Sequence, residues 1–433
     1  METAENVFNE LEESDWLEYI LATETAEAEA LEPSLLAEAK HRPDWPLWEK
    51  AITKELATLK TAGTWRLEEA PPGANIIGSK RVFKAKKDAA GNIARYKARL
   101  VAQGFSQIDD VDYDDTFAPV AKLASSHVLI AMANQLQLTL HQVDIKGAYL
   151  NGVLREDKIL YTQHPPSYKA PDAGKRVLRL QKALYGLKQA GRRWYQTFSS
   201  ILSSLGFTQC SVDQAVYHKT GAAAGDLIVI AVHVDDCTIA ASQPRLVEDF
   251  KTGLSKHVEV TDLGELHWML GIEVKRDRAA GKIHLSQQAY IDSILNRFNF
   301  ADLKPLSTPM DVQVKLSSKQ APASAAEFVA MCDIPYREAV SALNWAALAM
   351  CPDISFAVST MARFASNPGP AHWDTMKQIF RYLAGSCDLW ISYSEPQRTL
   401  TGYTDAEGSM AEDRCAITGY VFLIDGGAVL WSS

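Results

Sequence analysis

Two adjacent aspartates stand in the middle of an otherwise apolar stretch, IVIAVHVDDCTIAA at residues 228–241. Carboxylates are costly to bury among Ile, Val and Ala unless they are paired or bind a cation. The flanking runs are typical of two β-strands, which places Asp235 and Asp236 at the tip of a hairpin. A solvent-exposed turn is the commoner use of an Asp-Asp pair. The continuous hydrophobic flanks favour instead a pair of carboxylates fixed by a core.

Composition is that of an ordinary globular chain, with 433 residues of which 47% are hydrophobic and 22% charged. No apolar run approaches the roughly 20 residues that a membrane span requires, and the acidic start differs from a signal peptide. We therefore expect an intracellular, non-secreted protein with no membrane partner. The six cysteines show no paired or clustered spacing, which argues against a disulfide framework and a zinc site.

The net charge of −9 hides an uneven distribution. Residues 1–40 contain twelve acidic side chains and one lysine, a net −11, so the other residues carry +2. We expect residues 1–40 to form an acidic, disordered or loosely helical tail. Residues 80–105 and 175–193 contain eight and seven Lys or Arg, interleaved with Phe, Tyr and Leu. Such clusters suit a groove for a nucleic-acid backbone, although a solvated basic face explains either cluster alone equally well.

Hydrophobic periodicity predicts an α+β fold whose core contains an antiparallel sheet. The expected helices and strands alternate with hairpins, and a Pro/Ser-rich stretch at 303–326 resembles a linker. The expected helices cover 42–65, 125–138, 192–207, 336–350 and 372–385; the expected strands include a basic hairpin at 76–105, a strand at 139–149, and a hairpin at 262–286.

Asp144, near the end of the predicted strand at 139–149, supplies a third carboxylate from a second element. Nucleotidyl transfer by two metal ions needs carboxylates from at least two elements, and Mg²⁺ requires only a few of them besides substrate phosphates. Asp144, Asp235 and Asp236 therefore form a candidate site for two Mg²⁺ or Mn²⁺ ions. Bound cations would offset the repulsion between these carboxylates.

From about Trp45 onward the sequence resembles the reverse transcriptase of copia-type LTR retrotransposons. The motifs that carry the resemblance occur in the family's order: YKARLVAQGF at 96–105, VDIKGAYLNG at 143–152, LQKALYGLKQAGRRWY at 180–195, HVDD at 233–236, TDLGELHWMLGIEV at 261–274 and PDISFAVS at 352–359.

The resemblance implies an RNA-directed DNA polymerase with the right-hand architecture of fingers, palm and thumb. Its partners would be an RNA or DNA template with a primer, and dNTPs, in a cytoplasmic virus-like particle or in the nucleus. The implied divisions are fingers, palm, primer-grip hairpin and linker at 41–326, thumb helices at 327–385, and an incomplete ribonuclease H-like α/β segment at 386–433.

The same resemblance assigns site residues. Asp144, Asp235 and Asp236 become the catalytic metal ligands. Tyr149 would exclude a 2'-OH, and Gly186 would let template and incoming base approach closely. The implied nucleotide contacts are Lys97, Arg99, Tyr149, Gly186 and Gln189, with Lys188 beside them and with Lys84 and Lys86 competing for the triphosphate; the implied primer-terminus contacts are His233 and Val234.

Some positions depart from the family pattern, notably His233 where the family usually has Tyr, Gly191 for Pro, Arg81 for Trp and Cys351 for Arg. Two alternatives therefore remain beside an active polymerase. The first is a catalytically inactive nucleic-acid-binding remnant. The second, a metal-dependent nuclease, is weaker because only Asp405 matches the ribonuclease H carboxylates, and for that reason we expect no ribonuclease H activity.

Overall fold

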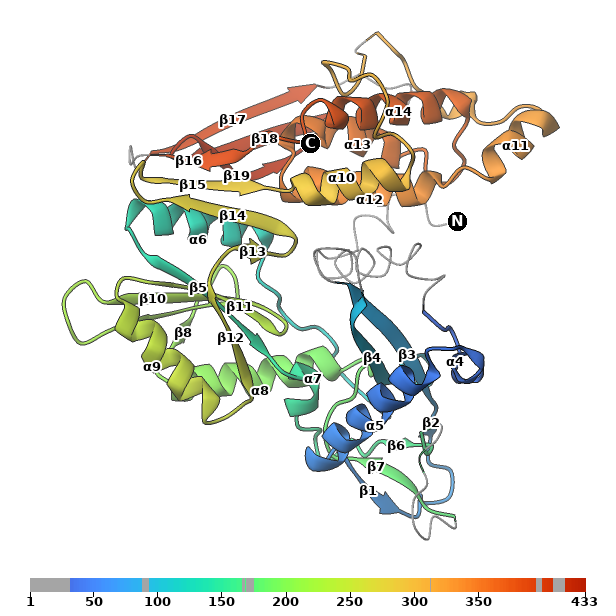
Figure 1. Cartoon of the computed structure of the whole chain (residues 1–433), viewed down its shortest axis with the longest axis vertical. Helices are drawn as coiled ribbons and strands as arrows, with labels where there is room; N and C mark the ends of the chain where they lie inside the picture. Colours follow the sequence, from blue (N-terminus) through green and yellow to red (C-terminus); the bar gives the residue numbers. More distant parts are fainter. Residues whose placement is uncertain are drawn as a thin grey trace.

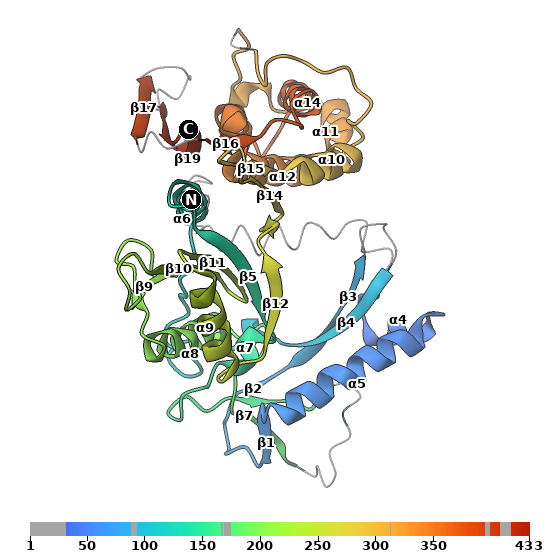
Figure 2. The ribbon, with the colours of Figure 1, turned by 60° about the vertical axis from the view of Figure 1, so that its left-hand side comes forward.

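The computed structural model describes residues 32–87, 93–165, 168, 175–311, 313–394, 399–407 and 417–433. Figures 1 and 2 show three groups of elements: a long helix with a β-ribbon, a larger sheet with its covering helices, and a bundle of helices above both. The fold is α+β with mainly antiparallel sheets. No helix in the described ranges has the length and apolar character needed to cross a membrane.

A six-stranded antiparallel sheet positions the aspartates. Its two central strands, β10 and β11, are buried on both faces, which explains the unbroken apolar runs around Asp235 and Asp236. Helix α6 covers one face, and α8 and α9 pack on the other. The elements in sheet order are β12 (Val260–Glu265), β5 (Thr139–Ile145), β11 (Asp236–Ala241), β10 (Leu227–His233), β9 (Val216–Thr220) and β8 (Thr208–Gln209), with α6 (Leu123–Gln135), α8 (Ala190–Ser204) and α9 (Pro244–Ser255).

The basic hairpin predicted from the sequence is a two-stranded ribbon that packs on α5 (Trp45–Thr61). Because side chains alternate across a strand, Phe83 and Ala98 face Trp48 of the helix, and the other face carries Lys84, Lys97 and Arg99. The elements of this region are α4 (Leu36–His41), β1 (Trp65–Glu68), β2 (Ile76–Ile77), β3 (Ser79–Lys87), β4 (Ile93–Ala102), β6 (Tyr161–Thr162) and β7 (Val177–Leu180).

The last part of the predicted acidic tail packs on the ribbon, and residues 1–31 lie outside the described ranges. Glu32 is buried, where its carboxylate pairs with Lys84 at 3.2 Å and accepts a hydrogen bond from the Ala85 N–H at 2.7 Å. Ala39 of α4 is fully buried in the cluster around Trp48. Residues 32–41 are therefore part of the ribbon's support.

The segment predicted as a linker, 303–326, packs on the helical bundle. The Arg381 side chain donates to the Lys304 carbonyl at 2.8 Å, and residues 325–332 form a helix that crosses the predicted boundary. Helix α10 also belongs to this bundle, because it shares one core with α12, α13 and α14. The bundle contains α10 (Gln288–Arg297), α11 (Ala325–Cys332), α12 (Tyr336–Ala349), α13 (Ser355–Ala362) and α14 (Pro370–Ala384).

The C-terminal strands pack against the body of the molecule. Strand β16 (Ile391–Tyr393) pairs with β15, and Trp431 of β19 donates to the Ala347 carbonyl of α12 at 2.7 Å. Tyr393 and Val429 lie in the same core as α6. The other strands of these two sheets are β13 (Trp268–Met269), β14 (Ile272–Asp277), β15 (Lys282–Ser286), β17 (Leu400–Glu407), β18 (Ile417–Ile424) and β19 (Gly427–Ser432).

Candidate active site

The structure brings the predicted aspartates of two strands together. Asp144 of β5 is the direct cross-strand partner of Asp236 of β11, and Asp235 precedes Asp236 in the turn. The Ile145 N–H donates to the Asp235 carbonyl at 2.8 Å, which attaches the turn to β5. All three aspartates are half-buried. The antiparallel register therefore places three carboxylates at one end of the sheet.

Burial is the main cause of a raised pKa at Asp235, and the negative charge of Asp144 adds to it. Arg99 and Lys97 act in the opposite direction. These two cations belong to β4, so the basic ribbon lies within electrostatic range of the turn. The three carboxylates thus form the centre of the site, and Lys97 and Arg99 supply positive charge at its edge.

The donor set fits Mg²⁺ or Mn²⁺, because carboxylate oxygens are the ligands that hard cations prefer. The described part of the chain holds no group of three or more His, Cys, Asp or Glu side chains already arranged to bind a metal ion. Mg²⁺ usually takes one or two carboxylates together with substrate phosphates. Neighbouring carboxylates that do not surround an ion by themselves are compatible with binding of Mg²⁺ together with substrate phosphates.

His233 is buried rather than open to a primer end. Its side chain is 5% exposed, the Ser126 hydroxyl of α6 lies 3.3 Å from its Nε2, and burial lowers the pKa of the ring to about 4. The ring therefore stays neutral at physiological pH and packs between β10 and α6. The predicted primer-terminus contact through this ring has no support in the structure.

Val234 occupies the first position of the two-residue turn between β10 and β11, with φ at 59°. Its carbonyl accepts a hydrogen bond from the indole Nε1 of Trp194 at 2.6 Å. The predicted role of Val234 at the primer terminus stays a prediction. Sequence reasoning missed Trp194, although it is the second-last residue of one of the family motifs and lies on the apolar stripe of α8.

Tyr149 lies on the short helix α7 (Ala148–Asn151), not on a strand, because Gly147 adopts the left-handed φ of 60° and ends β5. Its ring packs edge-on against Tyr185 with centroids 5.3 Å apart. The Arg99 guanidinium lies over Tyr185 at 4.8 Å. Tyr185, another residue that sequence reasoning missed, therefore links the ribbon to Tyr149.

The contacts made within the ribbon distinguish the candidate triphosphate-binding residues from one another. Lys84 is the cross-strand partner of Lys97, but the Lys84 ammonium forms the ion pair with Glu32. Lys97 and Arg99 follow one another on the same face of β4 and both act on Asp235. The side chain of Lys86 lies outside the described residues. The structure thus favours Lys97 and Arg99 over Lys84.

Gly186 and Gln189 have structural explanations that the sequence did not reveal. Gly186 has φ at 83°, and a Cβ added there would lie 2.3 Å from the Ala102 carbonyl oxygen. Its small size therefore serves the contact with β4. The Gln189 amide is buried, where it accepts from Gln107 at 3.0 Å and donates to the Asp112 carbonyl at 2.9 Å. Both residues therefore have a structural role, and their predicted contact with a nucleotide stays a prediction.

The remaining predicted residues lie at the edges of the site or away from it. Lys188 is exposed, with its ammonium 3.1 Å from the Tyr113 hydroxyl. Asp405 is exposed on β17, which Figure 1 places beside the helical bundle and away from β11.

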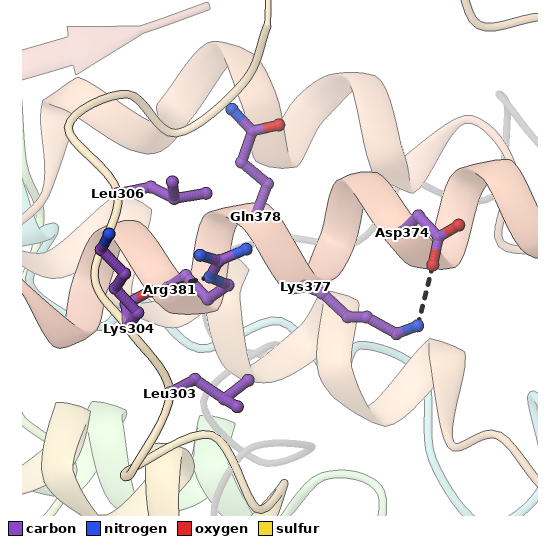
Figure 3. Close-up of a pocket in the computed structure, with 7 residues that line it drawn as sticks. All are labelled: Leu303, Lys304, Leu306, Asp374, Lys377, Gln378 and Arg381. Carbon is purple, nitrogen blue, oxygen red and sulfur yellow. Dashed lines mark hydrogen bonds and ion pairs between the residues drawn. The ribbon is translucent and has the colours of Figure 1, made fainter.

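The helical bundle contains a separate cleft of about 480 Å³ between α14 and the segment at 303–306 (Figure 3). It contains none of the predicted site residues. Its lining has three cations against one carboxylate: Lys304, Lys377, Arg381 and Asp374, together with Leu303, Leu306 and Gln378.

Comparison with known proteins gives consistent matches. The family model described as "Reverse transcriptase (RNA-dependent DNA polymerase)" matches residues 62–312. A Retrovirus-related Pol polyprotein from transposon TNT 1-94 of Nicotiana tabacum is 37% identical over 417 residues, which cover 96% of this chain and 31% of the relative. The corresponding polyprotein from transposon RE1 of Arabidopsis thaliana is 34% identical, covering 89% of this chain and 26% of the relative.

A putative transposon Ty5-1 protein of Saccharomyces cerevisiae is 31% identical, covering 67% of this chain and 92% of that protein. A solved structure of a foamy viral protease-reverse transcriptase in complex with double-stranded DNA has a TM-score of 0.44 at 9% identity, covering 89% of this chain and 55% of that one. This chain spans about a third or less of the two plant polyproteins. It belongs to the reverse transcriptase (RNA-dependent DNA polymerase) family, as a relative of the Pol polyproteins of copia-type retrotransposons.

Proposed function

We propose that this chain is an RNA-directed DNA polymerase that adds dNTPs to the 3'-OH of a primer annealed to an RNA or DNA template. The observation that carries the proposal is the cross-strand pairing of Asp144 with Asp236, with Asp235 in the adjoining turn. These carboxylates belong to segments far apart in the sequence, and they meet within range of the ribbon's cations.

Asp144, Asp235 and Asp236 would hold two Mg²⁺ or Mn²⁺ ions. Bound there, the ions would supply Lewis-acid activation of the primer hydroxyl and charge compensation for the phosphates. The chain's own contribution is rigidity, because β10 and β11 are buried on both faces and β5 is paired with β11 and β12. A rigid platform of this kind holds reacting groups in position, which lowers the entropic part of the barrier.

Lys97 and Arg99 support binding of the triphosphate, since both lie on the face of β4 that acts on Asp235. Tyr149 and Tyr185 supply an aromatic wall next to them. A ring at Tyr149 would leave no space for a ribose 2'-OH, which would make the site selective for deoxynucleotides.

The finer architecture belongs to the same proposal. The ribbon and α5 would be the fingers, the six-stranded sheet the palm, and α10 to α14 the thumb. The β13–β14 hairpin, with Leu270 and Gly271 at its turn, would grip the primer. The antiparallel strands β17, β18 and β19, with Asp405 on β17, support the opening of a ribonuclease H-like fold.

Primer extension on an RNA template, measured with Mg²⁺ and with Mn²⁺, tests the proposal. D235N should reduce extension at least about 100-fold, because it removes a charged ligand. D292N, which changes an exposed aspartate of α10, is the matched control and should extend normally. Equal extension by D235N and the unmodified chain would refute the proposal. Duplex binding without incorporation under either metal would select the inactive nucleic-acid-binding remnant instead.

A further inference from the structure

We infer that Trp194 is a positioning residue for the Asp235–Asp236 pair, because its indole N–H fixes the turn that presents both carboxylates. The expected effect on the rate of nucleotide incorporation rests on the proposed function. Its structural part depends only on the geometry of the turn.

The turn between β10 and β11 has a conformation that its sequence does not favour. His233 pairs with Asp236, so only Val234 and Asp235 form the loop. The φ of 59° at Val234 lies in the left-handed region, which a β-branched residue adopts only as an outlier. Glycine is the usual residue at the first position of such a hairpin turn. The surrounding structure must therefore impose the conformation.

Two hydrogen bonds from other elements attach to the turn. The Ile145 N–H binds the Asp235 carbonyl at 2.8 Å, and the Trp194 indole binds the Val234 carbonyl at 2.6 Å. The first is a backbone bond from the neighbouring strand, so no substitution of a side chain removes it. The second depends on one side chain of α8, which makes it open to a direct test.

The donor itself is rigidly placed. Trp194 is 2% exposed and stacks on Phe198 with centroids 4.9 Å apart. Helix α8 approaches α7 closely at Gly152, where an added Cβ would lie 2.9 Å from the Trp194 backbone nitrogen. The indole therefore has little freedom to follow the Val234 carbonyl if the turn moves. The bond resists relaxation of Val234 toward negative φ.

Relaxation of Val234 would rotate the peptide planes on either side of it, and the Asp235 side chain would move with them. A misplacement of about 1 Å at reacting groups can cost about 100-fold in rate. Helix α8 starts directly after the loop that contains Tyr185 and Gly186, so Trp194 also connects that loop to the aspartates. The indole thus sets the orientation of the pair without touching substrate.

The test compares W194F with W431F. Trp431 is a matched control, because it is 9% exposed and its indole donates to the Ala347 carbonyl at 2.7 Å, far along the chain from the turn. Both variants lose one buried N–H donor and keep an aromatic ring. W194F should reduce the single-turnover rate of incorporation about 10-fold or more, with template–primer Kd changed less than about twofold. W431F should keep the single-turnover rate of the unmodified chain, while its Tm should fall by about as much as that of W194F.

Amide hydrogen exchange of the peptide 228–241 gives a readout independent of activity. It should speed up in W194F and not in W431F. V234G supplies a second variant: glycine adopts positive φ without strain, so W194F introduced into V234G should cost at most about twofold in rate. Unchanged exchange in W194F, or an equal loss of rate in both tryptophan variants, would overturn the inference. Faster exchange in W194F together with no incorporation by the unmodified chain would refute the polymerase proposal and support the positioning role.

Discussion

Asp144 and Asp236 are direct partners across the β5–β11 ladder. Like charges placed opposite one another in a sheet destabilise it, and here a third carboxylate, Asp235, follows in the turn. The arrangement is unfavourable for folding alone and favourable for holding cations. Stability and function are therefore expected to oppose each other at this site.

The first prediction follows from that opposition. The pKa of Asp235 is raised by burial and by Asp144, so its contribution to stability is present at low pH and lost as pH rises through the folded pKa. Without added metal, D235N should raise Tm by about 1–2 °C at pH 7 and by less at pH 4. Differential scanning calorimetry with D292N as the control measures this. A lower Tm for D235N at pH 7 would contradict the assigned repulsion.

The buried histidine predicts a pH dependence of stability. His233 has a pKa lowered to about 4 by burial, so its contribution is fully present above about pH 6.5 and is lost as pH falls toward 4. The free energy of unfolding should decline by about 1 kcal/mol per pH unit from this residue in that window. The free energy of unfolding, measured with urea at several pH values, should depend less steeply on pH in H233Q. H257Q changes an exposed histidine and should keep the pH dependence of the unmodified chain. Parallel slopes for all three proteins would exclude His233 as the cause.

The two lysines that face each other across the ribbon should differ in nucleotide binding. K97Q should raise the KM for dNTPs about 10-fold, because Lys97 shares the face and strand of Arg99. K84Q should change KM less than about threefold and should lower Tm instead, because the Lys84 ammonium pairs with Glu32, which is buried. Steady-state kinetics and melting curves on both variants decide the assignment. A larger KM effect for K84Q would reverse it.

Gly186 can be tested against a glycine with the same backbone conformation. Gly186 and Gly73 have φ of 83° and 82°, but an added Cβ meets the Ala102 carbonyl at the first and nothing within 4 Å at the second. G73A should cost about 1–2 kcal/mol of unfolding free energy from backbone conformation. G186A should cost about 1–3 kcal/mol more from the collision. Equal costs would show that the contact with β4 is not what requires glycine.

Arg81 is a buried cation whose three guanidinium nitrogens have no hydrogen-bond partner among the described residues. Burial lowers its pKa, and Glu55 is the acidic group that opposes the shift. An apolar side chain of similar length removes this desolvation cost. R81M should therefore raise the free energy of unfolding by about 1–2 kcal/mol, measured by urea denaturation. A loss of stability would show that the attraction to Glu55 exceeds the cost of burial.

The sequence predicted the elements that carry the aspartates, because the apolar runs around Asp235 and the strand before Asp144 have clear periodicity. It also predicted the ribbon and its cations. It did not predict that His233 is buried, since burial depends on Ser126 of α6 more than a hundred positions away. Nor did it predict the contact of Gly186 with β4 or the hydrogen bonds of the Gln189 amide, because a short motif does not show which backbone lies beside it.

Composition did not show how the segments at 303–326 and before residue 40 pack, for a physical reason. Proline- and serine-rich composition at 303–326 marks the absence of regular structure, which is compatible with tight packing, as the bond from Arg381 to the Lys304 carbonyl shows. Acidic composition up to residue 40 likewise did not reveal that Glu32 has a cationic partner on β3. Composition reports local preference, whereas these contacts depend on partners distant in sequence.

The pairing of β15 with β16 determines how the helical bundle is attached. The chain leaves the body at the end of β15, forms α10 to α14, and returns at β16, with Leu285 opposite Ile391. The whole bundle is therefore an insertion between two adjacent antiparallel strands, and Trp345 of α12 and Met350, which follows that helix, also pack in the core that contains α6. The bundle cannot swing away from α6 without separating part of that shared core.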